Sequence, residues 1–97
     1  MVTGVQTCAL PIYSPRAYVA NASSNNVTVI DTASNTVVGA PITVGLRPTA
    51  IALNPSGSRV YVANRDSNNV TVIDTASNTV VGLPIAVGTN PSGIAVK

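Results

Sequence analysis

Residues 16–53 read RAYVANASSNNVTVIDTASNTVVGAPITVGLRPTAIAL, and residues 59–96 repeat this stretch with an offset of 43 positions. Of the 38 aligned positions, 28 are identical. Both copies consist of short apolar and β-branched runs separated by Asn, Ser, Gly and Pro, and neither has a long segment with the period of a helix. The chain therefore consists of repeats, and the repeating unit consists of strands.

The length of the repeat favours one architecture. A unit of about 40 to 45 residues built of short strands is typical of a β-propeller blade, whereas helical repeats of similar length need long amphipathic segments. Residues 70–73, VTVI, are apolar on nearly both faces, as blades stacked face to face require. The sequence predicts an all-β fold, a partial β-propeller with about two blades of four antiparallel strands.

The complete unit covers residues 46–88. Its predicted strands, which are separated by turn residues, are residues 49–53, 59–64, 70–74 and 79–87. Ala50 and Ala52 are small, which suits an innermost strand where neighbouring blades converge. Gly82 and Pro84 interrupt the last strand, which predicts a bulged or edge strand because Pro cannot donate a hydrogen bond to a sheet.

The chain begins and ends out of phase with this unit. Residues 13–45 supply strands two to four of an incomplete blade, residues 46–88 a complete blade, and residues 89–97 the first strand of the next, at residues 92–96. Propellers usually close with about 4 to 8 blades. We therefore expect a fragment of a longer repeat protein, or a protomer that self-associates through its open blade edges. The third strand of each repeat, uncharged until its final Asp, also predicts aggregation at these edges.

Residues 1–12 lie outside the repeat. Residues 2–12, VTGVQTCALPI, resemble the in-frame translation of a sequencing-library adapter, and the similarity between the repeats stops where this segment ends. We expect residues 1–12 to be a non-native segment; a genuine leader is the alternative, although the regions of a signal peptide are missing. Cys8 lies in this segment, so the rest of the chain offers no cysteine for a disulfide or a thiolate nucleophile.

The charge of the chain is low. It has five Lys or Arg residues, three Asp or Glu residues and a net charge of +2. The basic residues form no run, so we expect no nucleic-acid partner. No apolar stretch approaches the roughly 18 residues of a membrane span. The chain has no His, which excludes Ser-His-Asp catalysis and imidazole metal sites from this segment. We therefore predict no catalytic residue, no metal and no cofactor.

Two short motifs carry a resemblance to a known family. Residues 18–21 and 61–64 both read YVAN, and each is followed three residues later by NNVTVIDT. In these motifs the chain resembles the YVTN β-propeller repeat family, with Ala at the third motif position. That family includes cell-surface and surface-layer proteins, periplasmic or secreted propellers, and relatives of lactonase-type and quinoprotein-like enzymes. The resemblance implies an extracytoplasmic, prokaryotic scaffold, and it carries over no catalytic residue because the matched residues belong to the frame.

The predicted function is that of a non-catalytic β-propeller scaffold or binding module at the cell surface, in the periplasm or secreted. It would act by rigid presentation of loops to a protein or a cell-envelope polymer. The alternative is a fragment of a propeller enzyme, of lactonase or quinoprotein-like kind, whose catalytic residues lie in missing blades.

Several polar residues have structural explanations. Asp31 and Asp74 end the third strand of each repeat, where we expect them to accept hydrogen bonds from backbone N–H groups of the following turn. The repeat places them on neighbouring blades, which disfavours an acid–base pair. Tyr18 and Tyr61 recur inside apolar strands, so packing between blades is favoured over catalysis.

One stretch superficially matches a cation-binding loop. Asn64, Asp66 and Asn68 alternate like the first ligands of an EF-hand calcium loop. However, Asn69 stands where that loop has Gly, and Thr75 stands where it has the bidentate Glu. The mismatch favours a solvated hairpin turn.

The positions that differ between the repeats are the best candidates for partner contacts. Arg47 and Arg65 correspond to Asn90 and Ala22 in the other repeat, and they lie in connections, where surface loops carry specificity. Together with Asp66, they are the residues that we expect to touch a partner. Neutral drift in solvated loops is the alternative.

Overall fold

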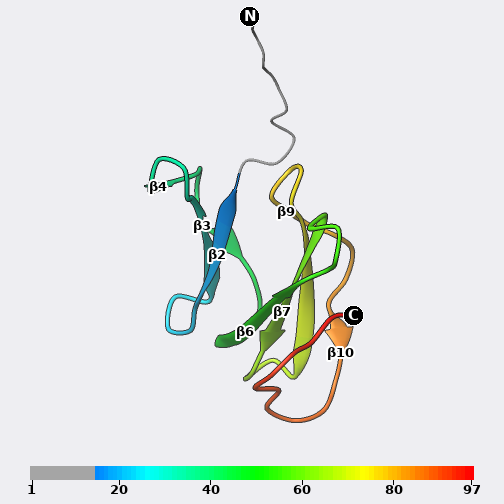
Figure 1. Cartoon of the computed structure of the whole chain (residues 1–97). Coiled ribbons are helices and arrows are strands. Elements are labelled where there is room, and N and C mark those ends of the chain that lie inside the picture. The colour runs from blue at the N-terminus through cyan, green and yellow to red at the C-terminus, as the bar shows by residue number, and fades with distance from the viewer. Residues whose placement is uncertain (1–14) are drawn as a thin grey trace, which may run out of the picture.

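The computed structural model describes residues 15–97, which form two small antiparallel sheets (Figure 1). The strands of the first sheet are β2 (Arg16–Asn21), β3 (Asn26–Asp31), β4 (Thr36–Val37) and β5 (Ile42–Thr43). The strands of the second are β6 (Pro48–Leu53), β7 (Arg59–Asn64), β8 (Asn69–Asp74), β9 (Thr79–Val80) and β10 (Ile85–Ala86). Among residues 15–97, no helix is long and apolar enough to cross a membrane.

Both sheets have the connectivity of propeller blades. In the second sheet β7 lies between β6 and β8, and β8 also pairs with β9 and β10. The first sheet repeats this arrangement with β2, β3, β4 and β5, and it has no counterpart of β6 among the described strands. The prediction of an all-β fold made of partial propeller blades is confirmed.

The outermost strand of each blade is broken, as its sequence predicts. The segment expected as one strand, residues 79–87, contains two strands of two residues each, β9 and β10. Gly82 lies between them with a φ of 65°, a left-handed conformation that suits glycine. Pro84 follows it and lacks the N–H group that would continue the sheet.

The predicted strand at residues 92–96 pairs with no strand among residues 15–97. A strand requires a neighbouring strand to accept and donate its backbone hydrogen bonds, and no described residue offers one. The segment is nevertheless held at its start, because the Thr49 hydroxyl donates to the Pro91 carbonyl oxygen at 3.3 Å.

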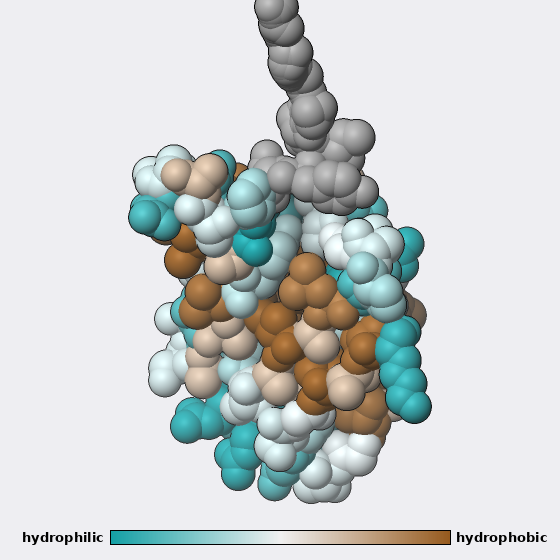
Figure 2. Space-filling model, viewed as in Figure 1, coloured by the Kyte–Doolittle hydropathy of each residue, from teal (hydrophilic) through white to brown (hydrophobic). Residues whose placement is uncertain are grey.

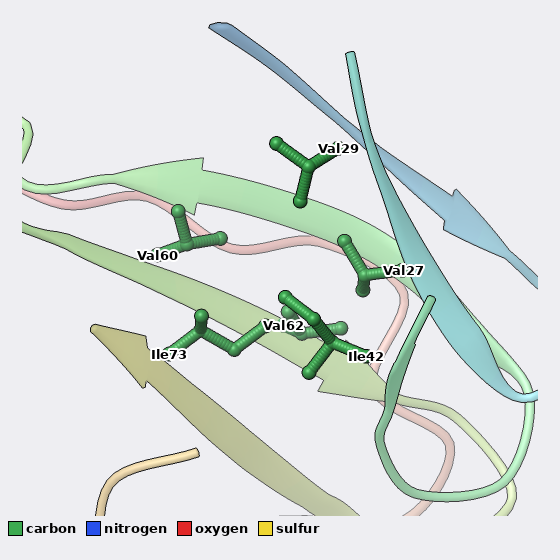
Figure 3. Packing of buried hydrophobic residues seen from close by; sticks show 6 residues of the cluster. All are labelled: Val27, Val29, Ile42, Val60, Val62 and Ile73. Carbon is green, nitrogen blue, oxygen red and sulfur yellow. The ribbon is translucent and has the colours of Figure 1, made fainter. Parts of the chain in front are cut away.

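The hydrophobic core lies between the two sheets. Its buried members come from both blades (Figure 3) and are Val27, Val29, Ile42, Val60, Val62 and Ile73. The first three belong to β3 and β5, and the last three belong to β7 and β8. No residue of the first group is the repeat equivalent of a residue of the second group. Each blade therefore contributes a different face to the core.

The hairpin turns depend on asparagine. Asn25 and Asn68 end the turns before β3 and β8, and Asn35 and Asn78 end the turns before β4 and β9. All four have a positive φ between 55° and 59°. Asn tolerates this left-handed conformation better than most residues, so the repeated Asn residues fix the turns that set strand register.

Candidate functional site

The three residues predicted to contact a partner lie together at one end of the blades. Arg47 belongs to the connection between the two sheets, and Arg65 and Asp66 begin the turn between β7 and β8 (lower end in Figure 1). Two backbone hydrogen bonds join these segments. The Arg65 N–H donates to the Arg47 carbonyl at 2.9 Å, and the Asp66 N–H donates to the Leu46 carbonyl at 3.1 Å. We call Leu46, Arg47, Arg65 and Asp66 the loop cluster.

Side chains of the neighbouring turns reinforce the loop cluster. The Ser67 hydroxyl accepts a hydrogen bond from the Leu46 N–H at 2.7 Å. The Asn25 Oδ1 atom, which comes from the first blade, accepts one from the Arg47 N–H at 2.9 Å. The connection is therefore tied to a turn of each blade, and its backbone is fixed although its side chains face solvent.

Arg47 has an unusual backbone conformation for its residue type. Its φ is 55°, and its repeat equivalent Asn90 has a φ of 52°. The Asn90 N–H makes the same contact as that of Arg47, with the Asn68 Oδ1 atom at 2.9 Å. Non-Gly residues other than Asn and Asp rarely adopt this conformation. Arg47 thus occupies a position that local geometry would assign to Asn.

The charges of the loop cluster are exposed. The Arg65 Nη1 atom lies 3.5 Å from the Asp66 Oδ1 atom, and both side chains are nearly half exposed. Exposed pairs of this kind contribute about 0 to 1 kcal/mol, so the guanidinium group of Arg65 can exchange partners easily. Arg47 is exposed and makes no ion pair with any of residues 15–97.

A buried asparagine lies against the connection that carries Leu46 and Arg47 of the loop cluster. Asn64, the last residue of β7, is fully buried, and its Nδ2 atom donates to the Asn69 Oδ1 atom at 2.9 Å and to the Thr71 Oγ1 atom at 2.8 Å. A Cβ atom added to Gly45 would approach the Asn64 side chain to 2.7 Å. Only glycine therefore lets the connection pass directly over Asn64.

The residues that superficially match a calcium loop do not converge. Asn64 is buried and bonded within its blade, Asp66 pairs with Arg65, and Asn68 binds the Asn90 N–H. Within residues 15–97 there is no group of three or more His, Cys, Asp or Glu residues that could hold a metal ion.

The aspartates at the strand ends cap turns, as predicted. The Asp31 Oδ1 atom accepts a hydrogen bond from the Ala33 N–H at 2.9 Å, and the Asp74 Oδ1 atom accepts one from the Ala76 N–H at 2.8 Å. Asp31 and Asp74 end β3 and β8, whereas the loop cluster lies at the ends where β3 and β8 begin. The carboxylates therefore belong to the opposite end of the blades.

Tyr18 and Tyr61 differ in what covers them. Tyr18 packs against the core, and its hydroxyl donates to the Asn78 Oδ1 atom of the other blade at 3.2 Å. This contact confirms the predicted inter-blade role of Tyr18. Tyr61 occupies the equivalent position on the second blade, where no described blade follows it.

The residues that fix the loop cluster were not singled out by the sequence. Asn25 and Ser67 have equivalents in the other repeat, Asn68 and Ser24, and so they look like ordinary turn residues. The only sequence signal was this invariance between the repeats. It shows that the turns need these residues, but not that their side chains reach the connection about 20 positions away.

Solved structures similar to this chain span a wide range of identity. Hydrazine synthase of Kuenenia stuttgartiensis shares 33% identity over 80% of this chain, with a TM-score of 0.76. A functionally unknown protein of Desulfotomaculum acetoxidans shares 25% over 78%, with a TM-score of 0.68. Apo AztD of Citrobacter koseri shares 16% over 88%, with a TM-score of 0.65, and supports the fold alone.

The chain spans about a quarter of each of these structures, between 22% and 26% of their length. No curated protein is a significant match. The family described as "Lactonase, 7-bladed beta-propeller" matches residues 13–83, which is most of the chain. With two stacked antiparallel blades in its structure, the chain belongs to this family of seven-bladed β-propellers.

Proposed function

We propose that the chain is part of a non-catalytic β-propeller scaffold that binds a partner through the loop cluster. The observation that carries this proposal is the fixed backbone of Leu46 and Arg47, which four hydrogen bonds tie to turns of both blades. A preorganised loop loses little conformational freedom on binding, so its exposed side chains can contribute most of their interaction energy to affinity.

The chemistry of the loop cluster favours an anionic partner. Arg47 and Arg65 both present guanidinium groups to solvent, and Asp66 is the only carboxylate of the cluster. Guanidinium groups match carboxylate and phosphate groups through paired N–H donors. Between a protein and a cell-envelope polymer as partner, we therefore favour an anionic polymer of the cell envelope.

The same proposal places the protein outside the cytoplasm and assigns its blades to the YVTN type. Support comes from the YVAN motifs, which end β2 and β7. In β2 the motif residue Tyr18 contacts the next blade through Asn78, and in both strands the motif Asn donates a hydrogen bond across the hairpin turn that follows it. The motif thus maintains the frame, while the divergent residues of the connections remain free for recognition.

A sedimentation experiment tests the proposed partner. Full-length chain is mixed with purified bacterial cell walls that carry wall teichoic acid, and with the same walls after acid removal of that polymer. We expect binding to the first preparation only. Arg47→Ala and Arg65→Ala should each weaken it about tenfold, because each removes charge-assisted hydrogen bonds.

Lys97→Ala is the matched control, because it removes one exposed positive charge outside the loop cluster. Equal losses for all three variants would show attraction by net charge alone. Equal binding to both wall preparations would refute an anionic polymer as the partner.

A second candidate function follows from the family match. The parent protein would be a lactone-hydrolysing propeller enzyme whose catalytic residues lie outside residues 13–83, the matched segment. Hydrolysis of a six-membered sugar lactone by the parent protein with all of its blades, measured by acid release, discriminates the two functions. A scaffold leaves the rate at that of buffer, whereas a rate that rises in proportion to protein concentration would favour the enzyme.

A further inference from the structure

Asp66 carries a charge that the fold does not use. The carboxylates of Asp31 and Asp74 each accept a hydrogen bond from a backbone N–H group and cap a turn. The Asp66 carboxylate accepts none from the backbone of residues 15–97, and it lies beside the Arg65 guanidinium group, with the Oδ1 and Nη1 atoms 3.5 Å apart. The contribution of Asp66 is therefore to the charge of the loop cluster.

The other repeat builds the same turn without either charge. Residues 21–26 read NASSNN, and residues 64–69 read NRDSNN. Two uncharged residues thus stand in the first turn where the second has Arg65 and Asp66. Both turns join their strands in the same register. The turn does not require the charged pair, which leaves the pair available for recognition.

The charges of Arg65 and Asp66 are presented side by side in a fixed place. The Arg65 N–H donates to the Arg47 carbonyl at 2.9 Å, and the Asp66 N–H donates to the Leu46 carbonyl at 3.1 Å. Both residues are thus held against the connection. Their side chains are 44% and 48% exposed, so a ligand can reach the positive and the negative group at the same time.

Arg47 adds a second positive group beside this pair. It lies across a backbone hydrogen bond from Arg65, is exposed, and makes no ion pair within residues 15–97. The surface at the lower end of the blades, where the loop cluster lies, is mostly hydrophilic in Figure 2, whereas the apolar area lies higher, over the second sheet. The loop cluster therefore recognises a ligand mainly by charge.

A ligand with anionic groups alone fits this arrangement poorly. An anion that approaches Arg65 also meets the Asp66 carboxylate, which lies 3.5 Å from the guanidinium group. It must either stay beside a like charge or separate Asp66 from Arg65 and leave that carboxylate unpaired. Like charges placed together select against a ligand. Asp66 therefore lowers the affinity of the loop cluster for a purely anionic ligand.

An ammonium group close to the anion removes this penalty. The phosphate of such a ligand binds guanidinium N–H donors, while its ammonium group contacts the Asp66 carboxylate. The four charged groups then alternate in sign, and the contact between Arg65 and Asp66 persists. Because the two protein charges are 3.5 Å apart, the two ligand charges must be joined by a short linker.

We propose that the loop cluster recognises zwitterionic units of a cell-envelope polymer, in which a phosphate group and an ammonium group lie close together. Arg47 and Arg65 bind the phosphate, and Asp66 binds the ammonium group and determines this specificity. The inference rests on the function proposed above and narrows the chemical class of the partner. Teichoic acid that carries alanyl esters has this chemistry, whereas the unesterified polymer has only the phosphate.

Two soluble probes test the pairing of charges. Phosphoethanolamine and its N-acetyl derivative share a phosphate group, and only the first has an ammonium group. NMR titration of the full chain, followed at the amide signals of the loop cluster, gives both dissociation constants. We expect phosphoethanolamine to bind about twofold to fivefold more tightly, the effect of one exposed ion pair. Equal binding, or tighter binding of the acetylated probe, overturns the inference alone; binding of neither probe overturns the function proposed above as well.

Asp66→Asn identifies the residue responsible. It removes the carboxylate charge and keeps the size of the side chain, so the preference for phosphoethanolamine should disappear. The matched control is Asp31→Asn, which removes the same charge at the opposite end of the blades and keeps an Oδ1 atom for the Ala33 N–H. The control should keep the preference. Loss of the preference in both variants would assign it to net charge, and its survival in Asp66→Asn would exclude that residue; either result overturns the inference.

Sedimentation with cell walls tests the polymer. Walls whose teichoic acid carries alanyl esters are compared with the same walls after mild base, which removes the esters and leaves the phosphates. The full chain should bind the esterified walls severalfold more tightly, and Asp66→Asn should bind both alike. Equal binding of the unchanged chain overturns the inference and leaves an anionic polymer as the partner. Phosphatidylethanolamine vesicles carry the same two charges on a lipid, and binding to them but not to walls would refute a polymer as the source.

Discussion

The close approach of Gly45 to Asn64, next to the loop cluster, is tested most directly by the substitution Gly45→Ala. The new methyl group would lie 2.7 Å from both the Cγ and the Nδ2 atoms of Asn64, a distance that real contacts do not reach. Gly45 does not have a left-handed φ, so backbone conformation does not oppose the substitution. The expected damage therefore comes from the contact with Asn64 alone.

The size of the expected destabilisation follows from the surroundings of the Asn64 side chain, which leave it little room to move. Its side chain is fully buried and makes two hydrogen bonds, to Asn69 and Thr71, so moving away breaks at least one of them. Overpacking a buried site costs about 1 to 3 kcal/mol, and a lost hydrogen bond costs about 1 kcal/mol. Replacing glycine by alanine also stabilises the fold by about 0.4 to 1 kcal/mol, because it lowers the conformational entropy of the unfolded chain. We expect Gly45→Ala to destabilise the chain by about 1 to 3 kcal/mol.

Urea unfolding of the full chain, followed by far-UV circular dichroism at one fixed protein concentration, measures this cost. The matched control is Gly88→Ala, the same change at the equivalent repeat position, where nothing lies within 4 Å of the added Cβ atom. Its stability should be unchanged or slightly raised.

A double-mutant cycle identifies the cause of the loss. Asn64→Ala removes the two nearest atoms that Gly45→Ala strikes, Cγ and Nδ2, and leaves only the Cβ atom of residue 64, at 2.9 Å. The combined variant should therefore be more stable than the sum of the two single effects predicts. Strict additivity, or equal losses at Gly45 and Gly88, would refute the close approach of the connection to Asn64.

Three further substitutions are each measured as a free energy of unfolding in dilute protein, and the first two have the equivalent residue of the other repeat as an internal control. Asn64→Ala should cost about 1 to 3 kcal/mol more than Asn21→Ala, because the same two hydrogen bonds are fully buried only at Asn64; equal costs would contradict the role of burial. Tyr18→Phe should cost about 0.5 to 1.5 kcal/mol through the lost inter-blade hydrogen bond, and Tyr61→Phe clearly less, since no described residue accepts from it; the reverse order would refute the assignment. Arg47→Asn should raise stability by a few tenths of a kcal/mol or more, roughly up to 1, because Asn tolerates the left-handed conformation better, while weakening wall binding; a loss of stability would show that the Arg47 side chain holds the fold.

Most strands and turns could be predicted from the sequence because they occur in both repeats. The strands β7 and β3 were expected from period and composition, and the structure has them at Arg59–Asn64 and Asn26–Asp31. The Asp31 cap was also predictable, because an aspartate accepts hydrogen bonds from the turn that immediately follows it. These features depend on neighbours in the sequence, and such information is local.

The remaining features depend on contacts between distant segments. Nothing in the pattern distinguishes Gly45 from Gly88, yet only Gly45 lies against a buried side chain. Likewise, the contact of Asn25 with the Arg47 N–H crosses 22 positions and depends on how the connection crosses the blade ends. The divergence of Arg47 and Arg65 drew attention to two loops, but only the structure shows that backbone hydrogen bonds join them.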